Sequence, residues 1–351
     1  MRSLARSERA RRRRARDCTS AWLAFVLCWV ILSSSACRRS TLQVATSDRE
    51  FWRLSEALSE PAGTFNVSDN FVSNEPHFAE NVRWLRPTGG VYVGVGPEQN
   101  YSYIARLRPA MAFIIDIRRE NRNLHLLYKA LFELSSDRAD FVSRLFSRLR
   151  PARLAPTASV EEIFRRYDGV ASSAEEYSRN AALVHERLLT ARGFPLSQSD
   201  LDSIDRAFKA FYADGPEIQF WGSRTVHGVR PSYRQLMTAQ DLIGESRSFL
   251  ATEDGFSFVK DLHWRNMIVP VIGDFGGPDA IRRVGDYVRQ HRDVIHAFYG
   301  SNVGVYLSTR QTRAFCKSLE ALPAAPGAWF IESDSLRSLT SKLRSCPPDA
   351  K

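Results

Sequence analysis

Short apolar runs alternate with stretches of helical periodicity along most of the chain. Runs rich in β-branched and aromatic residues occur at 90–94, 111–116, 267–272, 294–299 and 328–331. Between them, apolar residues recur at helical spacing, as at Leu124, Leu127, Tyr128 and Leu131. Strands without a polar face, alternating with helices, are typical of a mainly parallel sheet covered by helices on both sides. The pattern therefore predicts an α/β, Rossmann-like fold.

Polar residues predict where several helices begin and end. In a capping box, a side chain before a helix accepts a hydrogen bond from the N–H three residues later. This spacing occurs at residues 47–50, 159–162 and 199–202. The first of these helices should end at about Glu60. Residues 62–80 are rich in Gly, Asn, Ser and Asp, so we expect a loop there.

The last third of the chain carries two further helix signals. Pro278 stands at the expected first position of a helix through Ile281, Val284 and Val288, where its missing N–H costs nothing. Ser308 should begin the final helix. The run at 328–331 is then the last strand that the pattern predicts.

The domain organisation follows from where the strand-like runs are missing. Residues 135–256 show helical periodicity and no such run, and we interpret them as a large helical insertion. The insertion divides one α/β domain into a first half, 47–134, and a second half, 257–345. Ahead of them lie a basic segment, 1–18, and an apolar segment, 19–37.

Charge is distributed unevenly along the chain. The whole sequence has a net charge of +10. Residues 1–40 hold ten arginines against only Glu8 and Asp17, which accounts for +8 and leaves +2 for residues 41–351. A basic nucleic-acid-binding face of the fold is therefore not expected.

The apolar stretch at 21–32 is shorter than the roughly 20 residues that cross a bilayer. With arginines before it and the small residues 33–36 after it, it has the pattern of a secretory signal. Cys37 follows at the place of a lipidated cysteine, although Ser34 replaces the usual aliphatic residue of a lipoprotein signal. A cleaved signal, with or without lipid, an uncleaved anchor and a misannotated start remain open.

Both leading interpretations place the residues after Cys37 outside the cytoplasm, because the basic end stays inside. We therefore expect a protein of the cell envelope that contacts the membrane through its N-terminal segment. Cys316 and Cys346 are the only later cysteines. In an oxidising compartment they could form a disulfide that ties the C-terminal tail to the last helix.

Signatures of several enzyme classes are absent from the sequence. No C-x-x-C and no H-E-x-x-H zinc pair occurs, and we expect no metal. No G-x-S-x-G elbow and no P-loop is present either. Hydrolase and phosphotransferase functions therefore have no motif support.

The turn after the first predicted strand is the most informative candidate site. Gly94 and Gly96 would let the backbone approach a ligand, and Asp116 ends the next strand, where a carboxylate can bind ribose hydroxyls. Gln99 replaces the third glycine of the dinucleotide motif, and Glu98 adds a negative charge near a pyrophosphate position. The motif therefore disfavours NAD and FAD and is compatible with S-adenosylmethionine. Equally, it could be only a tight turn followed by a helix cap.

Three other segments contribute candidates because ligands of open α/β sheets bind at the carboxyl ends of the strands. Asp274 follows the third strand and could hold an adenine, and Asn302 follows the fourth and could face a substrate. Asn70 and Glu75 lie in a polar loop that could close over the same crevice. Polar residues also gather at strand ends without any ligand, and that alternative stays open.

Several blocks resemble a family of uncharacterised bacterial proteins similar in fold to class I S-adenosylmethionine-dependent methyltransferases. Several members of that family are exported or lipid-anchored. The blocks are 68–70, 94–101, 116–121, 128–133, 268–278 and 298–303. The resemblance spans about 50–332 and implies a cofactor position formed by Gly94, Gly96, Glu98, Asp116 and Asp274. Gly304 and Glu332 depart from the family pattern, which expects an acidic residue and an arginine there.

Two functions are compatible with these observations. One is an exported or membrane-anchored protein that keeps the methyltransferase-like scaffold and binds another small ligand or a partner at the envelope. The other is an active S-adenosylmethionine-dependent methyltransferase of unknown substrate. The predicted export disfavours the enzyme, because the methyl donor is a cytoplasmic metabolite.

Overall fold

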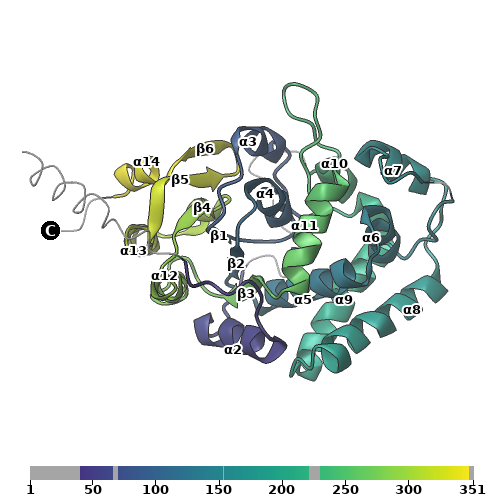
Figure 1. The fold of residues 1–351 in the computed structure, drawn as a ribbon, viewed down its shortest axis with the longest axis horizontal. Helices are drawn as coiled ribbons and strands as arrows, with labels where there is room; N and C mark the ends of the chain where they lie inside the picture. The colour runs from purple at the N-terminus through teal and green to yellow at the C-terminus, as the bar shows by residue number, and fades with distance from the viewer. Residues whose placement is uncertain (1–39, 66–69, 153, 221–229, 348–351) are drawn as a thin grey trace, which may run out of the picture. The chain divides into compact units, whose positions relative to one another are not determined.

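The structure is a computed structural model that describes residues 40–65, 70–152, 154–220 and 230–347. Thr41–Lys351 form one compact unit. Its centre is a six-stranded sheet of order β3-β2-β1-β4-β5-β6 (Figure 1). The strands are β1 (Val91–Gly94), β2 (Met111–Asp116), β3 (Ile268–Ile272), β4 (Ile295–Tyr299), β5 (Ala324–Glu332) and β6 (Ser335–Ser338).

Helices flank this sheet, as predicted for a Rossmann-like fold (Figure 1). All neighbouring strands are parallel except β5 and β6, which are antiparallel. β1, β2 and β3 are buried along their whole length, which explains their unbroken apolar runs. The flanking helices are α2 (Asp48–Leu58), α3 (Phe78–Trp84), α4 (Gln99–Leu107), α5 (Arg119–Leu134), α11 (Glu253–Trp264), α12 (Ala280–Gln290), α13 (Thr309–Glu320) and α14 (Leu339–Arg344).

The region between α5 and α11 contains helices and turns and lies away from the sheet in Figure 1. Aromatic side chains pack it onto α5, where Tyr128 contacts Phe141 and Phe211. Its helices are α6 (Arg138–Leu145), α7 (Val160–Tyr167), α8 (Ala174–His185), a π-helical turn (Glu186–Ala191), α9 (Gln198–Asp214), a 3-10 turn (Gly215–Glu217) and α10 (Tyr233–Met237).

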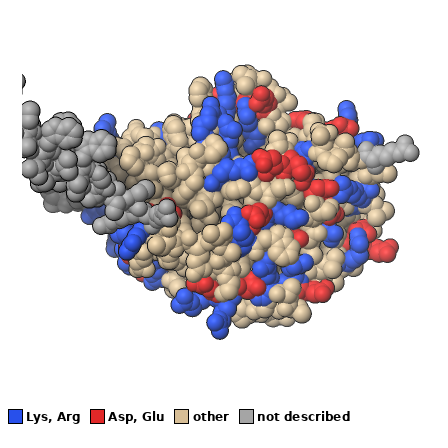
Figure 2. Space-filling view, in the orientation of Figure 1, with Lys and Arg blue, Asp and Glu red and all other residues tan. Residues whose placement is uncertain are grey.

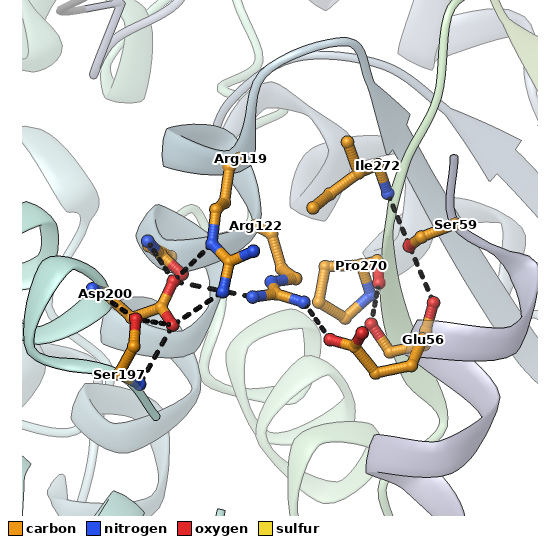
Figure 3. A network of polar contacts seen from close by, with 10 residues as sticks. Glu56, Ser59, Arg119, Arg122, Ser197, Asp200, Pro270 and Ile272 are labelled. Atoms are coloured by element: carbon orange, nitrogen blue, oxygen red, sulfur yellow. Dashed lines mark hydrogen bonds and ion pairs between the residues drawn. The ribbon is translucent and has the colours of Figure 1, made fainter. Parts of the chain in front are cut away.

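Helix α2 supplies hydrogen bonds to the outer edge of β3. Ser55 Oγ donates to the carbonyl of Pro270 at 2.5 Å, and the N–H of Ile272 donates to Ser59 Oγ at 2.9 Å (Figure 3). The N–H of Glu60 donates to the carbonyl of Ile272 at 2.8 Å. An edge strand exposes unpaired backbone groups, and proline is tolerated there because it lacks an N–H. The N-terminal helix thereby closes this edge of the sheet.

An ion cluster centred on the buried carboxylate of Asp200 joins α9 to α5. The Asp200 carboxylate accepts bonds from Arg119 Nε and Nη2 at 2.7 and 2.8 Å and from Asn123 Nδ2 at 3.1 Å (Figure 3). Arg122 Nη2 lies 3.4 Å from the same carboxylate, and its Nη1 pairs with Glu56 of α2. The cluster therefore fastens the helical region to the α/β unit through two helices.

Three predicted boundaries were wrong. The capping box of α9 begins at Ser197, not at Ser199, because Ser197 and Asp200 exchange side-chain and backbone hydrogen bonds. The predicted loop 62–80 contains the start of α3, whose first turn is buried. Pro278 precedes the N-cap of α12, Asp279, so it is not the first helical residue.

The C-terminal part contains more than the sequence pattern predicted. β6 and α14 follow the strand that should have been last. β6 is polar and partly exposed at the sheet edge, and therefore shows no apolar run. The predicted pairing of the two late cysteines is confirmed, because Cys316 of α13 and Cys346 form a disulfide.

The predicted basic and apolar N-terminal segments, 1–18 and 19–37, lie outside the described residues. Within the part of the chain that is described, no helix is long and apolar enough to cross a membrane. On the face shown in Figure 2, acidic and basic side chains are interspersed. This agrees with the small net charge of residues 41–351.

We expect Asp200→Ala to lower the free energy of unfolding by about 3 kcal/mol, because it removes the buried carboxylate that pairs with Arg119 and leaves the buried guanidinium of Arg122 with Glu56 as its remaining partner. Burial raises the pKa of Asp200, but hydrogen bonds from Arg119 and Ser197 outweigh it and bring the pKa below its usual value of 3.8. The ionised Asp200 carboxylate therefore contributes its full stabilisation of the folded state at pH values above 3.8. This contribution is lost as the pH falls and the carboxylate is protonated.

Urea unfolding at neutral and acidic pH measures this effect. Asp202→Ala is the matched control, because Asp202 is exposed on the same helix and bonds only the nearby Gln198 among the described residues. Equal losses for the two variants at neutral pH would contradict the assigned role of Asp200.

Candidate functional site

A pocket of about 290 Å³ opens at the carboxyl ends of β1 to β4. The chain order reverses between β1 and β4, since β1 leads toward β2 on one side and β4 continues toward β5 on the other. Such a reversal leaves a crevice where ligands of open α/β sheets bind. The wall includes Val95, Gly96 and Pro97 after β1, Asp116, Ile117 and Arg118 at the end of β2, Gly273, Asp274 and Phe275 after β3, and Tyr299, Ser301 and Asn302 at the end of β4.

The structure brings five of the eight predicted site residues to this pocket. They are Asn70, Gly96, Asp116, Asp274 and Asn302. The other three, Gly94, Glu98 and Glu75, are not among the residues that line it. Each of these three has a packing or hydrogen-bonding role beneath the pocket wall instead.

The two glycines of the β1 turn serve different purposes. A side chain at Gly94 would place its Cβ 2.0 Å from Asn100 Oδ1, so Gly94 is needed for close packing inside the protein. Gly96 has a φ of +76° and open space around it, and it does line the pocket. Asn100 Nδ2 donates to the carbonyls of Val95, Gly96 and Pro97 and thereby holds the turn in shape. Asn100 was not among the predicted site residues.

Asp116 is held in an ion pair inside the pocket wall. Its two carboxylate oxygens each accept a bond of 2.9 Å from the guanidinium of Arg118, and one also accepts from the Arg118 N–H at 3.0 Å. Both side chains are buried. The carboxylate that should have bound ribose hydroxyls is thus engaged by a residue two positions later.

Glu98 is fully buried at the start of α4. Its carboxyl group accepts a bond from the Ser73 N–H at 3.1 Å. Burial raises its pKa from 4.5 to about 8, so the group is mostly protonated at neutral pH. The expected negative charge near a pyrophosphate position is therefore absent at neutral pH, because the side chain turns away from water.

Glu75 is the centre of a buried hydrogen-bond network. It accepts bonds from Gln99 Nε2 at 2.7 Å, from Tyr299 OH at 2.8 Å, from Ser333 Oγ at 2.8 Å and from Ser301 Oγ. Burial raises the pKa of Glu75, and these four bonds lower it in part. Because its oxygens are occupied, Glu75 anchors the loop that carries Asn70 instead of facing a ligand.

Ser301 has a positive φ of +49°, which is unusual for a residue with a side chain. Its hydroxyl donates to Glu75, and the next residue, Asn302, lies on the pocket wall. The buried carboxyl group therefore helps to hold the strained turn that presents Asn302.

Glu60 organises the segment around Asp274. Its carboxylate accepts bonds from the N–H groups of Asp279 and Ala280 at 2.7 and 2.8 Å, at the start of α12. It also accepts from the Asp274 N–H at 3.1 Å. A distant carboxylate thus fills the anion position at this helix start. The sequence offers no signal for this, because Glu60 lies more than two hundred residues earlier.

Phe65, in the loop after α2, and Tyr306, at the end of a 3-10 turn (Val303–Tyr306), both contribute to the pocket. Phe65 and Tyr306 meet edge to face with ring centroids 4.9 Å apart. Both line the pocket, and Tyr306 is 41% exposed. They provide an apolar surface beside the polar groups.

In the portion of the chain described, no three His, Cys, Asp or Glu side chains gather as a metal site.

A family model matches residues 70–335, and the chain belongs to that family, a domain of unknown function (DUF7790). The match begins at Asn70, spans β1 to β5 and includes the helical region between them. No curated protein matches the chain. The family description names no activity.

We expect the stability of the protein to decline as the pH rises from about 4.5 to about 8, because the folded state favours protonated Glu98. Glu98→Gln keeps an acceptor for the Ser73 N–H and removes the cost of ionisation. It should flatten this decline and stabilise the protein at alkaline pH by as much as about 5 kcal/mol.

Thermal unfolding across this pH range measures the difference. Glu175→Gln is the control, since Glu175 is exposed on α8. If the unfolding temperature of Glu98→Gln fell with pH as steeply as that of the unchanged protein, Glu98 would not be the group that causes the decline.

Proposed function

We propose that this protein is an exported or membrane-anchored binding protein that holds a small polar molecule in the pocket at the carboxyl ends of β1 to β4. The observation that carries the proposal is the ion pair of Asp116 with Arg118. It occupies the carboxylate on which nucleotide-cofactor binding would depend, while other polar groups remain on the wall.

The methyl donor fits this pocket poorly. S-adenosylmethionine carries a positive sulfonium centre and two ribose hydroxyls. Asp116 already uses both carboxylate oxygens on Arg118, so these oxygens are not free to accept hydrogen bonds from the two ribose hydroxyls.

Methyltransferase activity remains the second candidate, because one observation favours it. The sheet has five parallel strands in the order β3-β2-β1-β4-β5 and an antiparallel last strand. This arrangement is compatible with the methyltransferase-like fold that the sequence resemblance implies. A fold of this kind also supports many unrelated functions.

Two features support the location. The segment of arginines followed by an apolar stretch has the pattern of an export signal. The disulfide between Cys316 and Cys346 is of a kind that persists in oxidising compartments and is rare in the cytoplasm. The two features are independent, because they lie at opposite ends of the chain.

For the unchanged protein we expect no calorimetric heat of binding with S-adenosylmethionine at about millimolar concentration. Arg118→Met frees the Asp116 carboxylate and removes the competing charge, and any affinity should appear first in this variant. Binding by the unchanged chain that Asp116→Asn abolishes would overturn the proposal in favour of the methyltransferase.

We expect a reporter that is active only outside the cytoplasm to be active when fused after Lys351. Alkylation of whole cells, followed by reduction, should show Cys316 and Cys346 protected until the reductant is added. A Cys316→Ser, Cys346→Ser double variant controls for other thiols. Export would be contradicted if only a reporter that works in the cytoplasm were active and if Cys316 and Cys346 were found as free thiols.

A further inference from the structure

Several polar groups on the pocket wall are used by the fold itself. The hydroxyls of Tyr299 and Ser301 donate to Glu75, and that of Ser73 donates to Gln99 at 2.6 Å. The buried ion pair at the end of β2 satisfies its own two charges. Only the polar side chains without such internal partners are therefore left to form hydrogen bonds with a ligand.

The remaining groups include the amides of Asn70 and Asn302 and the carboxylate of Asp274, and Asn74 and Gln311 also line the pocket. Asn70 Oδ1 is buried and has no hydrogen-bond partner in the described structure. Asn302 Oδ1 accepts a long bond of 3.4 Å from Ser301. Asp274 Oδ1 accepts from the Gly276 N–H at 2.8 Å, and within the described ranges its Oδ2 accepts no hydrogen bond. A buried acceptor without a partner costs free energy that a ligand donor would recover.

The charge of the wall disfavours anionic ligands. Its ionised side chains are two aspartates and Arg118, which is paired with Asp116, so the wall carries a net charge of −1. The start of α12 is also closed to a phosphate, because Glu60 already accepts its first N–H groups. A phosphorylated ligand would meet repulsion without a compensating cation.

The aromatic pair supplies the other part of the recognition surface. Phe65 and Tyr306 present aromatic surface beside the two amides and Asp274. A ring with an apolar face and hydroxyls around its edge matches both surfaces at once. The volume of about 290 Å³ lies near the lower end of small-molecule pockets and suits a single ring.

We propose that the pocket binds an unphosphorylated carbohydrate, whose hydroxyls bond to Asn70, Asn302 and Asp274 and whose apolar ring face packs on Phe65 and Tyr306. This inference rests on the proposed function, because it names the ligand class of the same pocket.

The test uses the full chain in a detergent without a sugar headgroup. The probes are glucose, galactose and N-acetylglucosamine, with glucose 6-phosphate, glycine and adenosine as comparisons, each at about 10 mM. Saturation-transfer NMR and the thermal unfolding midpoint report binding. We expect at least one neutral sugar to bind and glucose 6-phosphate to bind at least about tenfold more weakly.

The variants Asp274→Asn and Asn302→Ala should each weaken sugar binding by about tenfold or more while the unfolding midpoint without ligand stays unchanged. Asp286→Asn, which alters a partly exposed carboxylate on α12, is the matched control and should bind normally. Asn70→Ala serves as a third variant if either pocket variant unfolds.

The outcomes separate this inference from the proposed function. Binding of adenosine, glycine or glucose 6-phosphate that depends on Asn302, without binding of any neutral sugar, overturns the carbohydrate inference and leaves a small-molecule pocket. Binding of none of the six probes overturns both. Sugar binding that all three pocket variants retain overturns the assignment to this pocket.

Discussion

The buried carboxyl group of Glu75 is the contact on which the carboxyl edge of the sheet depends. Its four donors come from the start of α4, the end of β4, the strained turn after β4 and the turn between β5 and β6. Removing a carboxyl group from water is costly, and only a full set of donors offsets that cost. Each donor segment is thereby held at a defined position, and the loop with Asn70 is fixed over the same edge.

The pocket above this network is unlike a nucleotide site in its use of charge. Asp116 and Arg118 neutralise each other, Glu98 is buried and mostly protonated, and Glu60 fills the start of α12. The groups left for a ligand are amides, one carboxylate and an aromatic pair. A Rossmann-like scaffold with this pocket surface is compatible with the proposed neutral polar ligand, and the N-terminal sequence pattern and the disulfide are compatible with the proposed export.

The elements that the sequence predicted well are those with a strong local signal. β1 to β4 appeared as apolar runs, because both of their faces are covered, and α13 appeared through its Ser308 cap. β6 was missed because it is polar and half exposed. The start of α9 was misplaced by two residues because Ser197 and Ser199 both precede acidic residues at capping distance. Asp116, Asp274 and Asn302 were placed on the pocket because strand ends in a parallel sheet share one edge.

The sequence by itself determined the α/β class, the strand-end positions that meet at the pocket, the cysteine pair and the concentration of positive charge in the first forty residues. Only the tertiary structure decided which of the candidate side chains a ligand can reach. Glu75 and Ser333 are 258 positions apart, and Glu60 and Ala280 are 220 apart. Access and ionisation depend on such distant partners, because burial and hydrogen bonding, not residue type, determine whether a carboxyl group is charged and exposed.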